Sequence, residues 1–175
     1  MFLTKIEING FKSFAQKTIL DFSESGGLSI GDVLSKGSEG KNKKESDEKG
    51  ITAIVGPNGS GKSNVADALK WVMGEQSMKS LRGKKSSDII FAGSSNKSRL
   101  GSAQVSIFLD NSDKSIPIDY EEVVISRKVY QNGDSEYLMN KSKVRLGDVL
   151  ELLAKAGVGQ RSYSIVDQGM ADRLL

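Results

Sequence analysis

A glycine-rich segment, GPNGSGKS, carries the residue types that bind the phosphates of a nucleotide. Its residues are Gly56, Pro57, Asn58, Gly59, Ser60, Gly61, Lys62 and Ser63. The glycines permit a backbone in which several N–H groups turn inward toward phosphate oxygens. The lysine can reach the β- and γ-phosphates, and the final serine hydroxyl can bind Mg²⁺. The spacing therefore predicts a Walker A loop that binds ATP together with Mg²⁺.

The sequence on both sides of this loop favours the same interpretation. Residues 51–55, ITAIV, form a continuous β-branched run that is typical of a strand buried on both faces. After the loop, Val65, Leu69 and Val72 recur at helical spacing. A strand, a glycine loop and a helix in this order are the context that the motif requires, and the helix dipole favours anions. The alternative is a glycine-rich turn without a ligand. It would require the motif to occur by chance, which has a probability below about one in a hundred in a chain of this length.

The composition of the chain excludes several other kinds of site. The 175 residues contain no cysteine and no histidine, which excludes disulfides, thiolate metal sites and Ser-His-Asp chemistry. No apolar run approaches the roughly 18 residues that a membrane-spanning helix needs. The start, MFLTKIEING, alternates like a strand and does not resemble a signal peptide. We therefore expect a soluble, cytoplasmic protein without a membrane partner.

Basic residues are concentrated in one part of the chain. The formal net charge is only +3, which does not indicate a nucleic-acid partner. Residues 70–100, however, hold seven Lys and Arg against two acidic residues, a local charge of +5. A local excess of this kind can bind phosphates, and a solvated lysine-rich loop explains it equally well.

The first 50 residues combine two strands with a segment of different composition. Residues 2–9 and 18–22 are expected to pair as a hairpin. One side of the first strand should carry Phe2, Thr4, Ile6 and Ile8. Residues 23–50 hold six Gly, six Ser and eleven charged residues, too little apolar surface to offset the entropy of ordering. We predict a polar, mostly disordered surface insertion there, favouring a tolerated loop over a docking loop.

The rest of the chain mixes strands and helices. Strands are expected at residues 103–109, 122–130 and 135–140, with a hairpin turn at Asn132-Gly133. A helix should follow, with apolar residues on one face at Leu146, Val149, Leu150 and Leu153. The predicted fold class is α/β, with a sheet that is antiparallel in one part and parallel around the phosphate loop.

Longer strings in the chain resemble one known family. They are FLTKIEINGFKSFAQKT, GPNGSGKSN with its continuation VADALKWVMGEQSMKSLRGKKSSDIIFAGS, and GVGQRSYSIVDQG. These strings are similar to the N-terminal head segment of bacterial SMC (structural maintenance of chromosomes, condensin-type) proteins over residues 1–22 and 51–175. The resemblance implies a P-loop NTPase fold of the ABC type. Residues 1–175 would be the N-terminal lobe of an SMC ATPase head, with residues 23–50 as an insertion within it.

The resemblance also implies further residues of a nucleotide site. Lys12 and Ser13 match the family's turn that contacts the nucleotide, and Asn64 ends the matching loop string. Arg82, in SLRGKK, matches an arginine that reaches the phosphates, and its planar fork suits that role. Without the resemblance, Arg82 would be interpreted as a surface charge.

The catalytic and metal-binding residues follow from the same resemblance. Gln168, in VDQG, matches the glutamine that helps hold Mg²⁺ and the attacking water. Lys62, Arg82 and Gln168 would then form the catalytic set, and Ser63 with Gln168 would bind the metal. Without the resemblance, Gln168 would be interpreted as the polar end of a strand.

Double-stranded DNA is the macromolecular ligand that the resemblance implies. Lys85 and Arg145 match basic positions on the family's DNA-binding surface. Contacts of this kind go to the DNA backbone, so binding should be sensitive to salt and independent of sequence.

Two motifs of such ATPases are missing from the sequence: an LSGGQ-like signature and a Walker B strand that ends in Asp-Glu. In the family they lie in a C-terminal head half, beyond a coiled coil and a hinge. We therefore expect this chain to bind nucleotide weakly and not to hydrolyse it alone. The implied partners are that C-terminal half, a second SMC head in a homodimer, and a kleisin-type subunit. In the completed protein, ATP would join two heads and hydrolysis would separate them, which drives chromosome condensation and segregation at the nucleoid.

Three other functions remain open from the sequence. One is a DNA-repair ATPase similar to RecN or RecF. Another is a transporter nucleotide-binding domain, although the GFKSF and SLRGKK strings argue against it. The third is a head that binds nucleotide without hydrolysing it.

Overall fold

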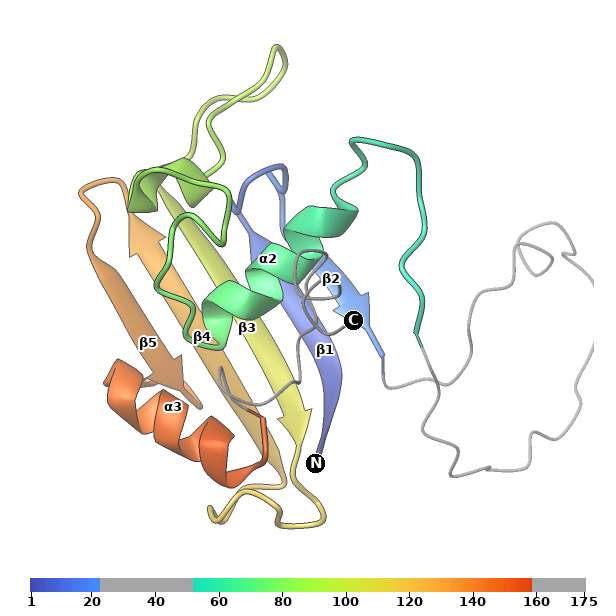
Figure 1. The fold of residues 1–175 in the computed structure, drawn as a ribbon, viewed down its shortest axis with the longest axis vertical. Coiled ribbons are helices and arrows are strands. Elements are labelled where there is room, and N and C mark those ends of the chain that lie inside the picture. The colour runs from blue at the N-terminus through green and yellow to red at the C-terminus, as the bar shows by residue number, and fades with distance from the viewer. Residues whose placement is uncertain (23–51, 159–175) are drawn as a thin grey trace, which may run out of the picture.

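The computed structural model describes residues 1–22 and 52–158, so the predicted insertion at residues 23–50 and the site residue Gln168 lie outside the described residues. The described residues form one six-stranded sheet with helices on one of its faces (Figure 1). The strands are β1 (Phe2–Asn9), β2 (Thr18–Asp21), β3 (Ser102–Asp110), β4 (Glu122–Tyr130), β5 (Ser135–Met139) and β6 (Ser142–Val144). The helices are α2 (Lys62–Val72), the 3₁₀-helix η1 (Ser86–Ile89) and α3 (Leu146–Lys155).

The strand order is β2-β1-β3-β4-β5-β6, and every neighbouring pair is antiparallel. The predicted turn between β4 and β5 is confirmed: the Gly133 N–H donates to the Tyr130 carbonyl at 2.9 Å, and Gly133 has φ +92°. A positive φ is readily adopted only by glycine, which is why Asn-Gly marks this type of turn. The alternating pattern of these strands therefore places them where the sequence predicts.

The first strand is confirmed, but only some of its side chains lie on the predicted side of the sheet. Ile6 and Ile8 are buried in the core as expected. The register with β3 shifts between Leu3 and Lys5, which is a β-bulge. Because one extra residue reverses the alternation of a strand, Leu3 packs against the core while Phe2 is 47% exposed. Counting alternate residues cannot detect such a bulge.

The prediction of a buried strand at residues 51–55 is wrong for residues 52–55, the part that the structure describes. Residues 52–55 belong to no strand, and Ile54 and Val55 are 45% and 83% exposed. A strand needs a neighbour that accepts and donates its backbone hydrogen bonds. No strand in the described ranges pairs with this segment, so the described sheet is antiparallel throughout and its predicted parallel part is not found there. The mixture of strands and helices nevertheless confirms the α/β class.

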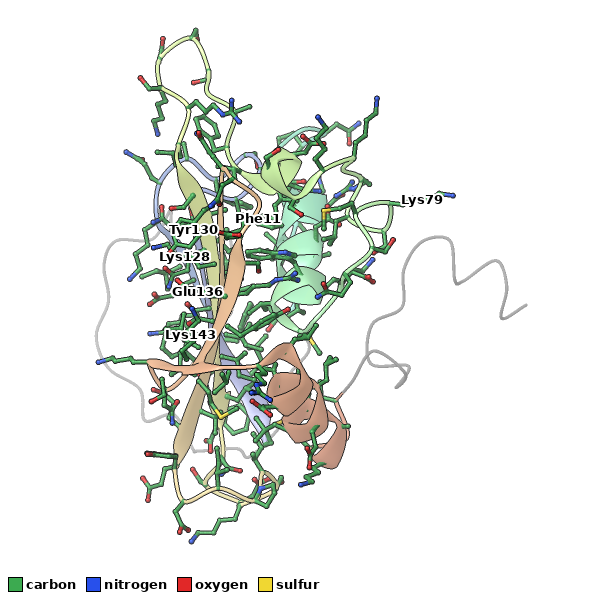
Figure 2. All side chains as sticks on the ribbon, turned by 90° about the vertical axis from the view of Figure 1, so that its left-hand side faces the viewer. Phe11, Lys79, Lys128, Tyr130, Glu136 and Lys143 are labelled. Atoms are coloured by element: carbon green, nitrogen blue, oxygen red, sulfur yellow. The ribbon has the colours of Figure 1, made fainter. Side chains whose placement is uncertain are left out.

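Helix α2 covers the middle of the sheet. Its buried face, Ala68, Trp71 and Val72, packs toward β3 and β4. The Trp71 ring lies 5.3 Å from the ring of Phe11, which Figure 2 shows between the sheet and this helix. Helix α3 covers β5 with the residues of the predicted apolar face, including Val149 and Leu153. Burial of these two faces provides the hydrophobic core.

The other face of the sheet is polar. In Figure 2, Lys128, Tyr130, Glu136 and Lys143 extend from the side of the sheet opposite the helices. The Tyr130 hydroxyl donates to Glu136 at 2.7 Å, and the Lys143 ammonium lies 3.3 Å from the same carboxylate. The hydrogen bond from Tyr130, with that from Lys143, lowers the pKa of Glu136. This face therefore carries polar and charged side chains and is not covered by a helix of the described residues.

A buried arginine fixes the C-terminal end of α2 to the sheet. Arg127 of β4 donates from Nη1 to the carbonyl oxygens of Trp71 at 2.9 Å and Glu75 at 2.8 Å. Its guanidinium also lies 4.7 Å from the Trp71 ring and 5.0 Å from the Tyr137 ring. Burial lowers the pKa of Arg127 and raises the pKa of Tyr137 to about 12. The last carbonyls of a helix need such donors, and their partial negative charge favours a cation.

None of the helices among the described residues is long and apolar enough to cross a membrane.

Candidate nucleotide-binding site

The predicted phosphate loop leads directly into α2. Gly61 is the N-cap of the helix with φ +94°, and Gly59 has φ +82°. Both glycines thus adopt the left-handed conformation that other residues disfavour. The Ser60 N–H donates to the Pro57 carbonyl at 3.3 Å and closes the turn. The first N–H groups of a helix have no partner within it, so the loop ends where an anion is favoured.

The lysine of the loop is held above the loop's own backbone. Lys62 Nζ donates to the carbonyl oxygens of Gly56 at 2.6 Å and Pro57 at 2.7 Å. These contacts keep an ammonium group at the start of α2, beside the exposed Ser63. A phosphate bound there would offer a more strongly charged acceptor than either carbonyl.

The turn that follows β1 brings the predicted residue Ser13 to the predicted residue Asn64, at the end of the loop. Asn64 Nδ2 donates to Ser13 Oγ at 2.8 Å. A β-carbon added at Gly61 would lie 3.1 Å from the same Ser13 oxygen. The turn itself is anchored where the Lys12 N–H donates to the Ile89 carbonyl at 2.7 Å. Ser13, Gly61 and Asn64 are therefore neighbours in the structure although Ser13 is remote from the loop in the sequence.

Lys12 and Arg82 meet at a residue that the sequence analysis missed. Asp67, on α2, is 4% exposed, and its Oδ2 accepts from Lys12 Nζ and from Arg82 Nη2. Arg82 Nε donates to the same oxygen at 3.2 Å. A charged residue on the otherwise apolar face of α2, four positions after Ser63, is the only signal that the sequence offers for it.

The residues present fit a nucleotide with Mg²⁺. The ammonium of Lys62, the helix N-terminus and the exposed Ser63 lie together, and Lys12 and Arg82 are joined one turn further along α2. No group of three or more His, Cys, Asp or Glu among the described residues could hold a metal ion. Mg²⁺ is commonly bound by one or two protein groups plus phosphate oxygens, for which the Ser63 hydroxyl suffices on the protein side.

The two predicted DNA-binding residues are exposed but far apart. Lys85 precedes η1, and its N–H donates to Asp88 at 2.8 Å. Arg145 precedes α3, and its N–H donates to Asp148 at 2.9 Å. In Figure 1, η1 lies near the top of the sheet and α3 at the bottom. The structure does not bring these two side chains together in one patch.

The fold and the loop together define a class of protein, the P-loop ATPase head of the ABC type. The chain belongs to the family described as RecF/RecN/SMC N terminal domain, whose model matches residues 35–165. It is an N-terminal head segment of the SMC type.

Within that class, the chain is similar to proteins named Chromosome partition protein Smc. It is 44% identical to the protein of Bacillus subtilis and 47% identical to that of Clostridium kluyveri, each over 175 residues. Both alignments cover all of this chain, and the chain spans 13% of the length of either relative.

Solved structures agree with this family. One, described as "Structural biochemistry of ATP-driven dimerization and DNA stimulated activation of SMC ATPases", is 36% identical with a TM-score of 0.82. That match covers 99% of this chain and 90% of the other. A second, described as SmcHead bound to the C-winged helix domain of ScpA, is 37% identical with a TM-score of 0.82, covering 99% of this chain and 46% of the other. A RecF structure is 21% identical with a TM-score of 0.53, which shows a similar fold alone.

Proposed function

We propose that this chain is the ATP-binding half of an SMC head that dimerises on ATP and couples ATP hydrolysis to DNA binding in chromosome condensation and segregation. The observation that carries the proposal is the arrangement at the start of α2. Two left-handed glycines, the ammonium of Lys62 and a helix N-terminus meet within one loop. This is the arrangement that phosphate groups require.

Each residue of the site has a proposed task. The backbone of residues 56–61 surrounds the phosphates, and Lys62 leaves its two carbonyl partners to pair with them. Ser63 holds Mg²⁺, which supplies charge neutralisation at the phosphates when bound. Ser13 and Asn64 fix the turn against the loop through their hydrogen bond of 2.8 Å. Lys12 and Arg82 supply further positive charge.

Hydrolysis requires more than the described residues provide. We propose that Gln168 orients the attacking water and assists with Mg²⁺, as its match to the family's glutamine implies. The chain carries no Asp-Glu pair at the end of an apolar strand after Ser63. A carboxylate that polarises water must then come from a C-terminal head half, and the chain alone binds ATP weakly without turnover.

Residues 52–55 are the proposed place where that second half joins. Ile54 and Val55 are exposed and unpaired by any strand of the described sheet. A strand laid beside them would bury apolar surface and satisfy their backbone groups. In this proposal residues 1–175 form one lobe of the head, with residues 23–50 as an insertion.

The partners follow from the descriptions of the structural neighbours. ATP-driven dimerisation, described for one of them, supports a second SMC head as a partner. Binding to ScpA, described for another, supports a kleisin-type subunit. DNA contacts through Lys85 and Arg145 are proposed to be sequence-independent, and the protein is proposed to act in the cytoplasm at the nucleoid.

ATP binding and hydrolysis by this chain, alone and mixed with a matching C-terminal head segment, test the proposal. We expect phosphate release only in the mixture, with an increase when DNA is added. Lys62→Ala should weaken ATP binding by roughly ten- to a hundredfold, the value of a charge-assisted hydrogen bond. Lys143→Ala, on the polar face of the sheet, is the matched control and should leave binding unchanged. Hydrolysis that survives in Lys62→Ala, or that occurs without the second segment, would overturn the proposal.

A further inference from the structure

A buried carboxylate, that of Asp67, contacts two of the proposed cationic residues of the site. Asp67 is 4% exposed, and its Oδ2 accepts three hydrogen bonds, one from Lys12 and two from Arg82. Burying a carboxylate is costly unless cations and donors compensate for it. These contacts therefore compensate for the burial of the Asp67 carboxylate, and they also restrain the two cations.

The three side chains belong to three separate segments. Lys12 comes from the turn after β1, Asp67 from α2 and Arg82 from the segment before η1. Lys12 Nζ also donates to the carbonyl of Leu81, the fully buried neighbour of Arg82. The Arg82 side chain is thus bonded directly to the helix that starts at the phosphate loop, and the backbone at Leu81 is linked to that helix through Lys12.

The backbone at both cationic residues is in an unfavourable conformation. Lys12 has φ +49° and Arg82 has φ +55°, in the left-handed region that non-glycine residues avoid. Such conformations persist where the surrounding contacts determine them, and they are concentrated at functional sites. The side chains of these two residues are held by Asp67 and Leu81, and their backbone N–H groups donate to the carbonyls of Ile89 and Lys79.

The pairing leaves part of the arginine available. A guanidinium has five N–H donors, and Asp67 takes those on Nε and one on Nη2, which leaves three. The Arg82 side chain is 54% exposed, whereas that of Asp67 is 5% exposed. Asp67 also lies one helical turn beyond Ser63 on the same helix.

We propose that Asp67 is a positioning residue, which holds one edge of Arg82 so that its remaining N–H groups can bind the phosphates of ATP in the neighbouring loop. Lys12 shares the carboxylate and completes the restraint. This inference rests on the proposed function, since it concerns the same bound nucleotide. A purely structural Asp67 would contribute to stability without changing the affinity for ATP.

A double-mutant cycle on ATP affinity distinguishes the two roles. The full chain, mixed with the C-terminal head segment, is compared as wild type, Asp67→Asn, Arg82→Ala and the double variant, with the melting temperature of each measured. We expect each single change to weaken ATP binding roughly tenfold, as for one charge-assisted hydrogen bond. The double variant should bind no more than about twofold more weakly than Arg82→Ala, because both changes remove one interaction.

The control is Asp148→Asn, which removes a carboxylate that caps α3 away from the loop and should lower stability without changing ATP affinity. Unchanged binding by Asp67→Asn, or losses that multiply in the double variant, would overturn the inference. Where Asp67→Asn does not fold, Arg82→Lys decides: an ammonium lacks the rigid planar fork that presents one edge to Asp67 and the other N–H groups to phosphate in a fixed geometry, so wild-type affinity would refute the inference. If the wild type itself fails to bind ATP, the proposed function fails.

Discussion

Replacing the glycines of the phosphate loop by alanine separates two physical requirements of the site. Gly59 has φ +82° and open space around the position of a β-carbon. Gly61 has φ +94°, and an added β-carbon would also lie 3.1 Å from Ser13 Oγ, a tight contact. Gly101 has open space and no positive φ, so it serves as the control.

The expected losses follow from these geometries. A left-handed conformation costs an L-residue roughly 1–2 kcal/mol, which corresponds to about a five- to thirtyfold change in affinity. In the free protein the exposed loop can relax to another conformation, but bound phosphate requires the inward N–H groups and reimposes the positive φ. Gly59→Ala should therefore weaken ATP binding by about this factor. Gly61→Ala should weaken it further, because Ser13 must move as well, and Gly101→Ala should have no effect.

Titration calorimetry with ATP, on the chain mixed with a matching C-terminal head segment, measures these affinities. Urea unfolding of the same variants shows whether the strain of the left-handed backbone lowers the free energy of unfolding instead of the affinity for ATP. If Gly59→Ala bound ATP as tightly as Gly101→Ala, the argument from the left-handed backbone would be refuted. If Gly61→Ala bound ATP as tightly as Gly59→Ala, the contact with Ser13 would not contribute to the loss of affinity.

Two further predictions concern the C-terminal end of α2 and the DNA contacts. Arg127→Met should lower the free energy of unfolding by about 2–4 kcal/mol, since it leaves the carbonyls of Trp71 and Glu75 without their donor, and urea unfolding measures this loss. Lys85→Ala and Arg145→Ala should each weaken binding to duplexes of any sequence and reduce the slope of log affinity against log salt by about 1, as measured by fluorescence anisotropy.

Both experiments have matched controls on the polar face of the sheet. Lys128→Met removes a neighbouring cation that does not contact α2, and its stability should stay close to wild type. Lys143→Ala removes an exposed positive charge and should leave the salt slope unchanged. An equal loss of stability in Arg127→Met and Lys128→Met would contradict the assigned role of Arg127, and a loss of affinity confined to one DNA sequence would contradict backbone binding.

Patterns within a few residues predict the local features of this fold correctly. The Asn132-Gly133 turn, the two strands that flank it and the apolar face of α3 depend on turn chemistry and periodicity, which short stretches contain in full. The start of α2 at Lys62, directly after the glycines, follows in the same way.

Features that depend on remote neighbours could not be predicted. Residues 52–55 have the composition of a buried strand, but composition does not say whether a pairing strand is present. The facing of Phe2 depends on a bulge against β3, about a hundred residues away in the sequence. Asp67 was missed because its partners lie 55 residues before it and 15 residues after it. A helical pattern shows only that it faces the core.

The pairing of β1 with β3 has a consequence for the order in which this protein folds. Ile6 pairs with Ile107, so the 100 residues between them, including the whole phosphate loop, are enclosed by that single closure. The strands from β3 to β6 join neighbours in the chain and can form quickly as successive hairpins, whereas the closure by β1 is a slow, long-range event. Because the cost of closure grows only with the logarithm of length, residues 23–50 add about 0.3 kcal/mol to it. We therefore expect the turn with Lys12 and Ser13 to reach the loop only after this closure, which would complete the proposed nucleotide site late in folding.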